Sequence, residues 1–211
     1  VKHENEIGWD ILIKMELLTP FQKWQMEHLM EDGVTVRLGC EISKALSYMA
    51  DHGFVHRDVK PENIYVDSLG KFKLGDFEIT GTIEKINDGL VKIGTECYMA
   101  PEVYLGKEYN VQADVYSLGV VLYRLLNHDR LPFYPPITEK ITEDDRKNAL
   151  MRRIQGLPVP EPANGNAELK AVVLKACEYL PENRYANMNE FHDALQNVEK
   201  RPEVIHPNQT P

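Results

Sequence analysis

The sequence predicts an α+β fold that is mainly helical and contains one small β-hairpin. Apolar residues recur at helical spacing over about 35–52, and residues 114–126 are apolar on nearly every face. Between these stretches, the runs IYVD and KFKLGD alternate in polarity on either side of Ser68-Leu69-Gly70, which is typical of a two-stranded hairpin. A helix that is apolar all round is buried, so we expect residues 114–126 to lie in the core.

The composition indicates one domain or one large lobe. With 211 residues, of which 43% are hydrophobic, the chain can bury a substantial core. Its net charge is −9 and no block of basic residues is present, which argues against nucleic acid or an anionic membrane surface as a partner. The three cysteines have no metal-like spacing and fit a reducing compartment.

No apolar run approaches the roughly 20 residues that a membrane helix needs, and the first residues do not resemble a signal peptide. We therefore expect this segment to make no membrane contact and to be cytoplasmic.

The first half of the chain offers start and stop signals for most elements. We expect two strands at the N-terminus, a short one before Gly8 and a second over residues 9–17. Pro20 can open a short helix over residues 21–30, since proline is favoured in a first helical turn. The helix over 35–52 should stop near Gly53, because glycine is favoured just past a helix end.

Capping residues mark three further helices in the second half. Thr142 precedes an acidic first turn, and Asn166 can cap a helix over residues 167–179. Asn187 and Glu190 form a capping box for a last helix to about residue 197.

The loop HRDVKPEN, residues 56–63, carries the chemistry. It places the carboxylate of Asp58 two residues before the ammonium of Lys60 and five before the amide of Asn63, with a proline that prevents a helix. A helix end and the hairpin hold this loop beside Asp76, which follows the second strand. Carboxylate and amide oxygens are hard donors of the kind that Mg²⁺ takes when phosphates complete its shell.

This loop, followed by GDFE, GTECYMAPE and DVYSLGVVLYRLL, resembles the large lobe of a eukaryotic-type serine/threonine protein kinase. The resemblance covers roughly residues 9–197 and implies a protein kinase-like fold, with a mainly helical C-terminal lobe and the last strands of the small lobe. It divides the chain into a remnant of the small lobe and hinge (1–18), a C-terminal lobe (19–200) and a linker tail (201–211).

The resemblance implies a role for each side chain of the loop. Asp58 would accept the proton of the attacking hydroxyl, Lys60 would neutralise charge on the moving phosphoryl group, and Thr95 would bond both of them. Asn63 and Asp76 would hold Mg²⁺ against the phosphates of ATP. Lysine two positions after the aspartate is typical of serine/threonine kinases, so the implied partner is a protein that carries Ser or Thr.

The same resemblance implies the nucleotide contacts. Backbone groups around Glu16 and Leu18 would pair with adenine at the hinge, and Tyr65 would form the floor of the adenine pocket, although a strand tyrosine also fits simple packing. Lys60, Asn63 and Asp76 would contact the phosphates directly or through the metal. Gln22 stands where many kinases have an acidic ribose contact, which puts that contact in question.

Other residues are expected to be structural or regulatory. His56 would pack beneath the loop, Asp114 would hold the loop backbone, and Arg184 would pair with Glu102. Residues 76–102 resemble the activation segment. We expect Thr80 or Thr82 to be a phosphorylation switch, because Arg57 can bind phosphate in a bidentate manner.

Two departures from the family leave alternatives open. Glu78 replaces the glycine of the DFG motif, and no Gly-rich loop or VAIK-like lysine precedes Glu16. We therefore expect a fragment with weak activity alone, whose small lobe a longer parent chain supplies. The alternatives are a pseudokinase or scaffold that binds without catalysis, and a small-molecule phosphotransferase, which the APE segment disfavours.

Overall fold

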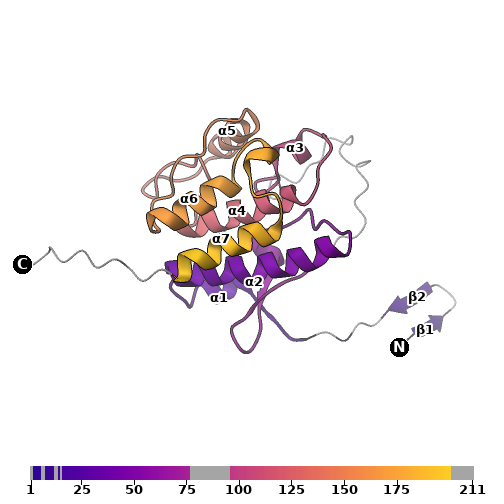
Figure 1. Cartoon of the computed structure of the whole chain (residues 1–211). Helices are drawn as coiled ribbons and strands as arrows, with labels where there is room; N and C mark the ends of the chain where they lie inside the picture. The colour runs from indigo at the N-terminus through magenta and orange to yellow at the C-terminus, as the bar shows by residue number, and fades with distance from the viewer. Residues whose placement is uncertain (1, 6–7, 12–13, 15, 77–95, 201–211) are drawn as a thin grey trace, which may run out of the picture.

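The computed structural model describes residues 2–5, 8–11, 14, 16–76 and 96–200 (Figure 1). The strands are β1 (Lys2–Asn5), β2 (Gly8–Ile11), β3 (Thr19–Pro20), β4 (Ile64–Val66) and β5 (Phe72–Leu74). The longer helices are α2 (Asp32–Asp51), α4 (Gln112–Leu126), α5 (Glu143–Ile154), α6 (Ala167–Ala176) and α7 (Met188–Lys200). Shorter helical segments are α1 (Phe21–Gln25), η1 (Pro61–Asn63), α3 (Pro101–Tyr104) and η3 (Pro181–Asn183). The predicted α+β class with mainly helical content is confirmed.

Helix α4 forms the centre of the helical body. Gln112 and Arg124 are its only residues that are not buried, as expected for a helix that is apolar on nearly every face. It contacts α2, α6 and α7. In Figure 1, α2 and α7 run side by side below it, and the contacts between these two helices confirm that they pack together. The predicted place of residues 114–126 in the core is therefore confirmed.

The predicted hairpin is present and lies on α2. Strands β4 and β5 are antiparallel, with Ile64 opposite Leu74, and the two-residue strand β3 pairs with the other edge of β4. The carboxylate of Glu41 in α2 accepts the N–H of Phe72 in β5 at 2.6 Å. This bond fixes the hairpin to the long helix.

A left-handed residue ends α2 where the sequence predicts. Gly53 has φ +79°, a conformation that favours glycine. The N–H of Gly53 donates to the carbonyl of Ala50 at 2.9 Å, and the N–H of Phe54 donates to the carbonyl of Met49 at 3.0 Å. These bonds satisfy the last carbonyls of the helix and turn the chain into the loop over residues 56–63.

Two predicted elements at the N-terminus are shorter than expected. The second strand spans Gly8–Ile11 rather than 9–17, and these four residues are the ones that pair with β1; residues 12, 13 and 15 of the predicted strand lie outside the described residues. Helix α1 ends at Gln25 rather than at Met30, since Met26 and Leu29 are exposed and provide no apolar face to pack against the core.

The predicted caps are present. Thr142 and Asp145 form a reciprocal capping box at α5, and the side chain of Asn166 accepts the N–H of Leu169 at α6. At α7, Asn187 accepts the N–H of Glu190 as expected, but the carboxylate of Glu190 accepts the N–H of Ala186 instead of that of Asn187.

The ends of the last two long helices differ from the prediction. Helix α6 ends at Ala176, three residues before the predicted end, and the carbonyls of Glu178 and Tyr179 beyond it accept hydrogen bonds from Arg184. Helix α7 extends to Lys200, three residues beyond the expected end.

All three cysteines of the chain lie in the described part, are buried and form no disulfide. Within that same part, no helix combines the length and the apolar character that crossing a bilayer would require.

Candidate active site

The loop over residues 56–63 brings three of the predicted site residues together. The carboxylate oxygen Oδ2 of Asp58 lies 2.6 Å from Nζ of Lys60 and accepts Nδ2 of Asn63 at 2.9 Å. The same Nδ2 also donates to the backbone carbonyl of Asp58 at 2.8 Å. Asn63 is buried in the single turn η1, which begins at Pro61, so its side chain has little freedom. The carboxylate of Asp58 is thus held by a cation on one side and an amide on the other.

Asp114 holds the backbone of this loop from below, as predicted. Its Oδ2 accepts the N–H of His56 and its Oδ1 accepts the N–H of Arg57, both at 2.8 Å. Burial raises the pKa of Asp114, although these two bonds and the charge of Arg57 favour the ionised form. Arg57 has φ +71°, which is uncommon for a residue with a Cβ. The carboxylate from α4 therefore stabilises a strained conformation next to Asp58.

His56 links the loop to the end of the hairpin. It is buried, and its Nε2 lies 3.2 Å from the carbonyl oxygen of Gly75. The N–H of Gly75 in turn donates to the carbonyl of Asn63 at 2.8 Å. The structural role predicted for His56 is confirmed, and these bonds place Asp76 directly beside the loop.

Tyr65 contacts the last predicted metal residue. Its hydroxyl donates to Oδ2 of Asp76 at 3.3 Å, and burial, followed by the charge of Asp76, raises the pKa of Tyr65. A Cβ on Gly75 would lie only 2.8 Å from the ring of Tyr65, so glycine is required for this close approach. Asp76 itself is exposed and has φ +55°. The hairpin therefore presents the carboxylate of Asp76 on a strained turn.

The predicted hinge residues lie beside the same sheet. Oε2 of Glu16 is 2.6 Å from Nζ of Lys73, which is also 3.4 Å from Asp67. Leu18 is half-buried and directly precedes β3, in which Pro20 stands opposite Tyr65. The sheet thus brings the stretch around Glu16 and Leu18 next to Tyr65.

One contact of this region was not predicted. Nε2 of Gln22 donates to Oε1 of Glu62 at 2.7 Å, across 40 residues of sequence. The sequence signal available for this contact was the position of Glu62 inside the PEN turn. In the structure its neighbours Pro61 and Asn63 are both buried, whereas Glu62 is exposed and can reach Gln22.

Comparison of the sequence with known proteins identifies the family of this chain. The family model described as the protein kinase domain matches residues 10–197. The chain belongs to the protein kinase family. The family expected from the four sequence motifs is therefore confirmed, and with it the protein kinase-like fold.

Several curated kinases are similar to this chain. Serine/threonine-protein kinase PknB of Mycobacterium tuberculosis is 35% identical over 162 residues, which cover 74% of this chain and 24% of that protein. Serine/threonine-protein kinase Pkn1 of Myxococcus xanthus is 34% identical over 180 residues, covering 78% of this chain and 24% of that protein. A probable serine/threonine-protein kinase of Clostridium acetobutylicum is 32% identical over 167 residues, covering 75% and 23%. The chain spans about a quarter of the length of these curated relatives.

In this chain, the segment after residue 95 is fixed to the helical body at two points. Arg184 and Glu102 form a bidentate pair with two contacts of 2.7 Å, and both side chains are buried, as the sequence predicted. Nη1 of Arg124 donates to the hydroxyl of Tyr98 at 2.6 Å. Burial raises the pKa of Tyr98 to about 12, although the charge of Arg124 opposes this effect. Both contacts hold the segment in one conformation.

Four residues with predicted roles lie outside the described residues. They are Thr95, Glu78 and the two candidate switch residues Thr80 and Thr82.

Proposed function

We propose that this chain is the catalytic lobe of a serine/threonine protein kinase that transfers the γ-phosphoryl group of ATP to a hydroxyl of a protein. The arrangement of Asp58, Lys60 and Asn63 carries this proposal, because a carboxylate fixed between a cation and an amide can accept a proton from a hydroxyl. The names of the relatives support the choice of Ser and Thr as acceptors. A cytoplasmic place and a role in signalling belong to the same proposal.

Each predicted side chain has a task in this transfer. Asp58 would orient the attacking hydroxyl and accept its proton, and Lys60 would neutralise charge on the transferred group. Thr95 would bond both residues. Asp114 would act only through the loop backbone, so it is a positioning residue.

The residues near the hairpin fit a magnesium ion and a nucleotide. Both bonds of the Asn63 amide nitrogen go to Asp58, so its amide oxygen is the atom suited to bind a cation. Together with the carboxylate of Asp76 this gives two hard oxygen donors, which suits Mg²⁺ when phosphates supply further ligands. When bound, Mg²⁺ would neutralise the charge on the phosphates of ATP.

The nucleotide contacts and the division of the chain also belong to this proposal. The backbone around Glu16 and Leu18 would pair with adenine, and the ring of Tyr65 would lie under it. The arrangement of β3 beside β4 supports this placement, since it puts residues 16–18 near Tyr65. Residues 1–18 would then be the end of a small lobe and hinge, and residues 19–200 the C-terminal lobe.

Two variants of the full-length protein test the proposal. Asp58→Asn should lower the rate of phosphoryl transfer by roughly 10²–10⁴-fold, because an amide accepts no proton. It should leave the binding of ATP with Mg²⁺ unchanged. Asp76→Ala should abolish the magnesium-dependent part of nucleotide binding, as measured by calorimetry with and without a chelator. Asp51→Asn, at the exposed end of α2, is the matched control and should change neither quantity.

Two results would overturn the proposal. Equal nucleotide affinity in the wild type and in Asp76→Ala would remove Asp76 from the metal site. If the wild type showed no magnesium-dependent nucleotide binding, the pseudokinase or scaffold alternative would be favoured. The sequence feature that supports this alternative is Glu78 in place of the glycine of the DFG motif.

A further inference from the structure

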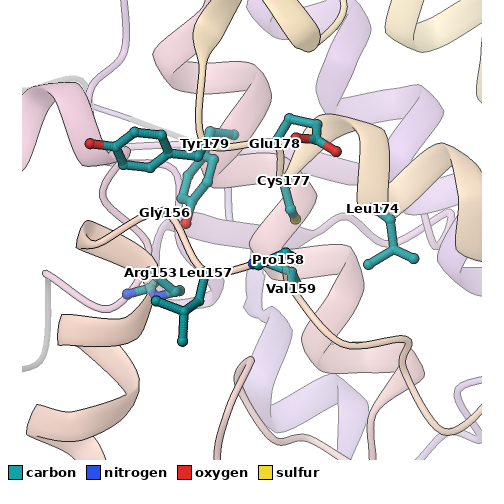
Figure 2. A pocket seen from close by; sticks show the side chains of 10 residues that line it. Arg153, Gly156, Leu157, Pro158, Val159, Leu174, Cys177, Glu178 and Tyr179 are labelled. Carbon is teal, nitrogen blue, oxygen red and sulfur yellow. The ribbon is translucent and has the colours of Figure 1, made fainter.

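A second candidate binding site lies between the end of α5 and the end of α6. A cavity of about 250 Å³ opens there, and Figure 2 shows the side chains that line it. Arg153 and Leu157 come from the last turn of α5 and the chain after it, whereas Leu174 and Cys177 come from α6 and its end. None of the lining residues belongs to the loop over 56–63 or to the hairpin. The cavity is therefore distinct from the proposed phosphoryl-transfer site.

The cavity contains a buried cation without a matching anion. Arg153 is only 4% exposed, and no carboxylate of the described residues lies within salt-bridge distance of it. Its Nη1 is buried and has no hydrogen-bond partner among those residues. Its Nη2 has a long bond of 3.5 Å to the carbonyl of Glu96, and the side chain also bonds with the neutral hydroxyl of Tyr116. A buried guanidinium is costly unless it is paired and hydrogen-bonded, so this side chain has unused capacity for an anion.

Arg184, which lies nearby, shows what a satisfied guanidinium looks like in this molecule. It forms the bidentate pair with Glu102 and donates to three backbone carbonyls, those of Gln112, Glu178 and Tyr179. Arg184 also lies over the ring of Tyr116, which lines the cavity. The contrast between the two arginines shows that, among the described residues, Arg153 keeps donor capacity that Arg184 does not.

The other ionisable groups of the lining do not neutralise Arg153. Burial raises the pKa of the Cys177 thiol to about 12, so the thiol is neutral at physiological pH. Burial also raises the pKa of Tyr116, whose hydroxyl bonds to Arg153, so this phenol is neutral as well. Glu178 is exposed, and no contact places its carboxylate on Arg153.

The remaining lining is mostly apolar. Leu157 and Pro158 are exposed and belong to the mouth of the cavity, whereas Val159 and Leu174 pack partly against the core. An apolar wall with one buried cation suits a small molecule that has an apolar body and one negative group. A planar guanidinium matches a carboxylate in particular, because it can donate two parallel N–H bonds.

We propose that this cavity binds a small organic carboxylate, with its carboxylate on Arg153 and its apolar body against Val159 and Leu174. The volume admits a ligand the size of a substituted benzoate, and the affinity of a ligand this small is expected to be millimolar.

The test uses the purified full-length protein and sodium benzoate as the probe, with binding measured by ligand-observed NMR and by titration. Benzoate should bind in a saturable manner, whereas benzamide, its neutral counterpart of the same shape, should bind at least about tenfold more weakly. Arg153→Met keeps the volume of the side chain but removes the charge and should lower the affinity for benzoate by the same factor.

Two further variants separate the cavity from general charge effects. Arg152 is the exposed neighbour of Arg153 and lies over the ring of Phe133. Arg152→Met therefore removes a charge of the same kind from outside the cavity, and this variant should bind benzoate as the wild type does. Val159→Phe keeps Arg153 but fills the cavity, and it should abolish binding.

The stability of Arg153→Met gives an independent check on folding. Because no carboxylate of the described residues pairs with this buried charge, its removal should leave the unfolding midpoint unchanged or raise it. Equal benzoate affinity in the wild type, Arg153→Met and Arg152→Met would overturn the proposal. Absence of saturable benzoate binding by the wild type would overturn it as well, and neither result would bear on the phosphoryl-transfer site.

Discussion

At the scale of single residues, the pair of Glu102 and Arg184 is the most buried ionic contact of the described residues. Both contacts are 2.7 Å long, and the side chain of Arg184 is completely buried. Glu102→Gln would leave this guanidinium in the interior without its counter-charge. We expect the free energy of unfolding to fall by about 3–5 kcal/mol, as measured by urea denaturation.

The exposed pair of Glu143 and Arg146 provides the matched control. Its atoms are 3.6 Å apart, and both side chains are open to solvent. Glu143→Gln should cost less than about 1 kcal/mol, because water and salt screen exposed charges. If the two substitutions had similar effects, burial would not govern the strength of the pair at residue 102.

Some contacts of single residues could be predicted from the sequence, and others could not. The motif around residues 56–63 is sufficient to predict that Asp58, Lys60 and Asn63 meet, because all three lie within one short loop. Arg152 and Arg153, by contrast, are adjacent residues of the same type, yet only Arg153 is buried. The difference depends on which face of α5 turns toward the helical body: Arg153 shares its face with the buried Ala149 and Leu150, and no sequence motif singled out this arginine. The cavity beside Arg153 could not be predicted for the same reason.

At the scale of elements, the turn of the hairpin depends on one carboxylate. Oδ1 of Asp67 accepts the N–H of Leu69 at 2.8 Å and that of Lys71 at 2.9 Å. The bond from Lys71, then those from Leu69 and Lys73, hold the pKa of Asp67 below its usual value of 3.8. A carboxyl group whose pKa is lower in the folded state stabilises the fold above its unfolded pKa, and this contribution is lost as the pH falls through the folded value.

The hairpin should therefore weaken in acid because of Asp67. In Asp67→Asn, the amide oxygen can still accept both N–H groups but does not titrate. We expect the variant to unfold at a somewhat lower temperature than the wild type at neutral pH, because it lacks the contribution of the ionised carboxylate, and the two temperatures should converge in acid. Between about pH 5 and pH 3 it should lose less stability than the wild type. Thermal unfolding at a series of pH values measures this difference, and parallel pH curves for the two proteins would contradict it.

The elements that the sequence predicts well are those with local causes. Gly53 ends α2, Thr142 and Asn166 cap their helices, and the alternating runs pair as β4 and β5. The elements predicted with wrong ends depend on distant partners. The strand β2 is seen only over the residues that pair with β1, and the chain after α6 is held by Arg184, which binds the carbonyls of Glu178 and Tyr179.

At the scale of the whole molecule, the burial of α4 could be predicted, but the way its neighbours approach could not. An apolar helix must be buried, and this is visible in residues 114–126. Which helices touch it, and how closely, depends on small residues at the contacts. Gly39 of α2 faces Leu122 of α4 and Leu195 of α7, and a Cβ there would lie 2.8 Å from the side chain of Leu195.

Gly119 tests whether this close packing stabilises the fold. A Cβ on Gly119 would lie 2.8 Å from Cβ of Ala176 and 3.2 Å from the backbone carbon of the same residue. Neither atom belongs to a flexible side chain, so α4 and α6 would have to move apart. We expect Gly119→Ala to lower the free energy of unfolding by about 1–3 kcal/mol.

Gly33 is the matched control for this substitution. It also lies within a helix, but a Cβ there would have no atom within 4 Å. Gly33→Ala should therefore raise the free energy of unfolding by about 0.4–1 kcal/mol, because alanine loses less backbone entropy on folding than glycine. Opposite signs for the two variants in urea denaturation would show that contact between α4 and α6, rather than helix propensity, decides the effect at residue 119. A gain in stability from Gly119→Ala would instead mean that the helices can separate at no cost, and the packing of the whole helical body around α4 would then be looser than its interatomic distances indicate.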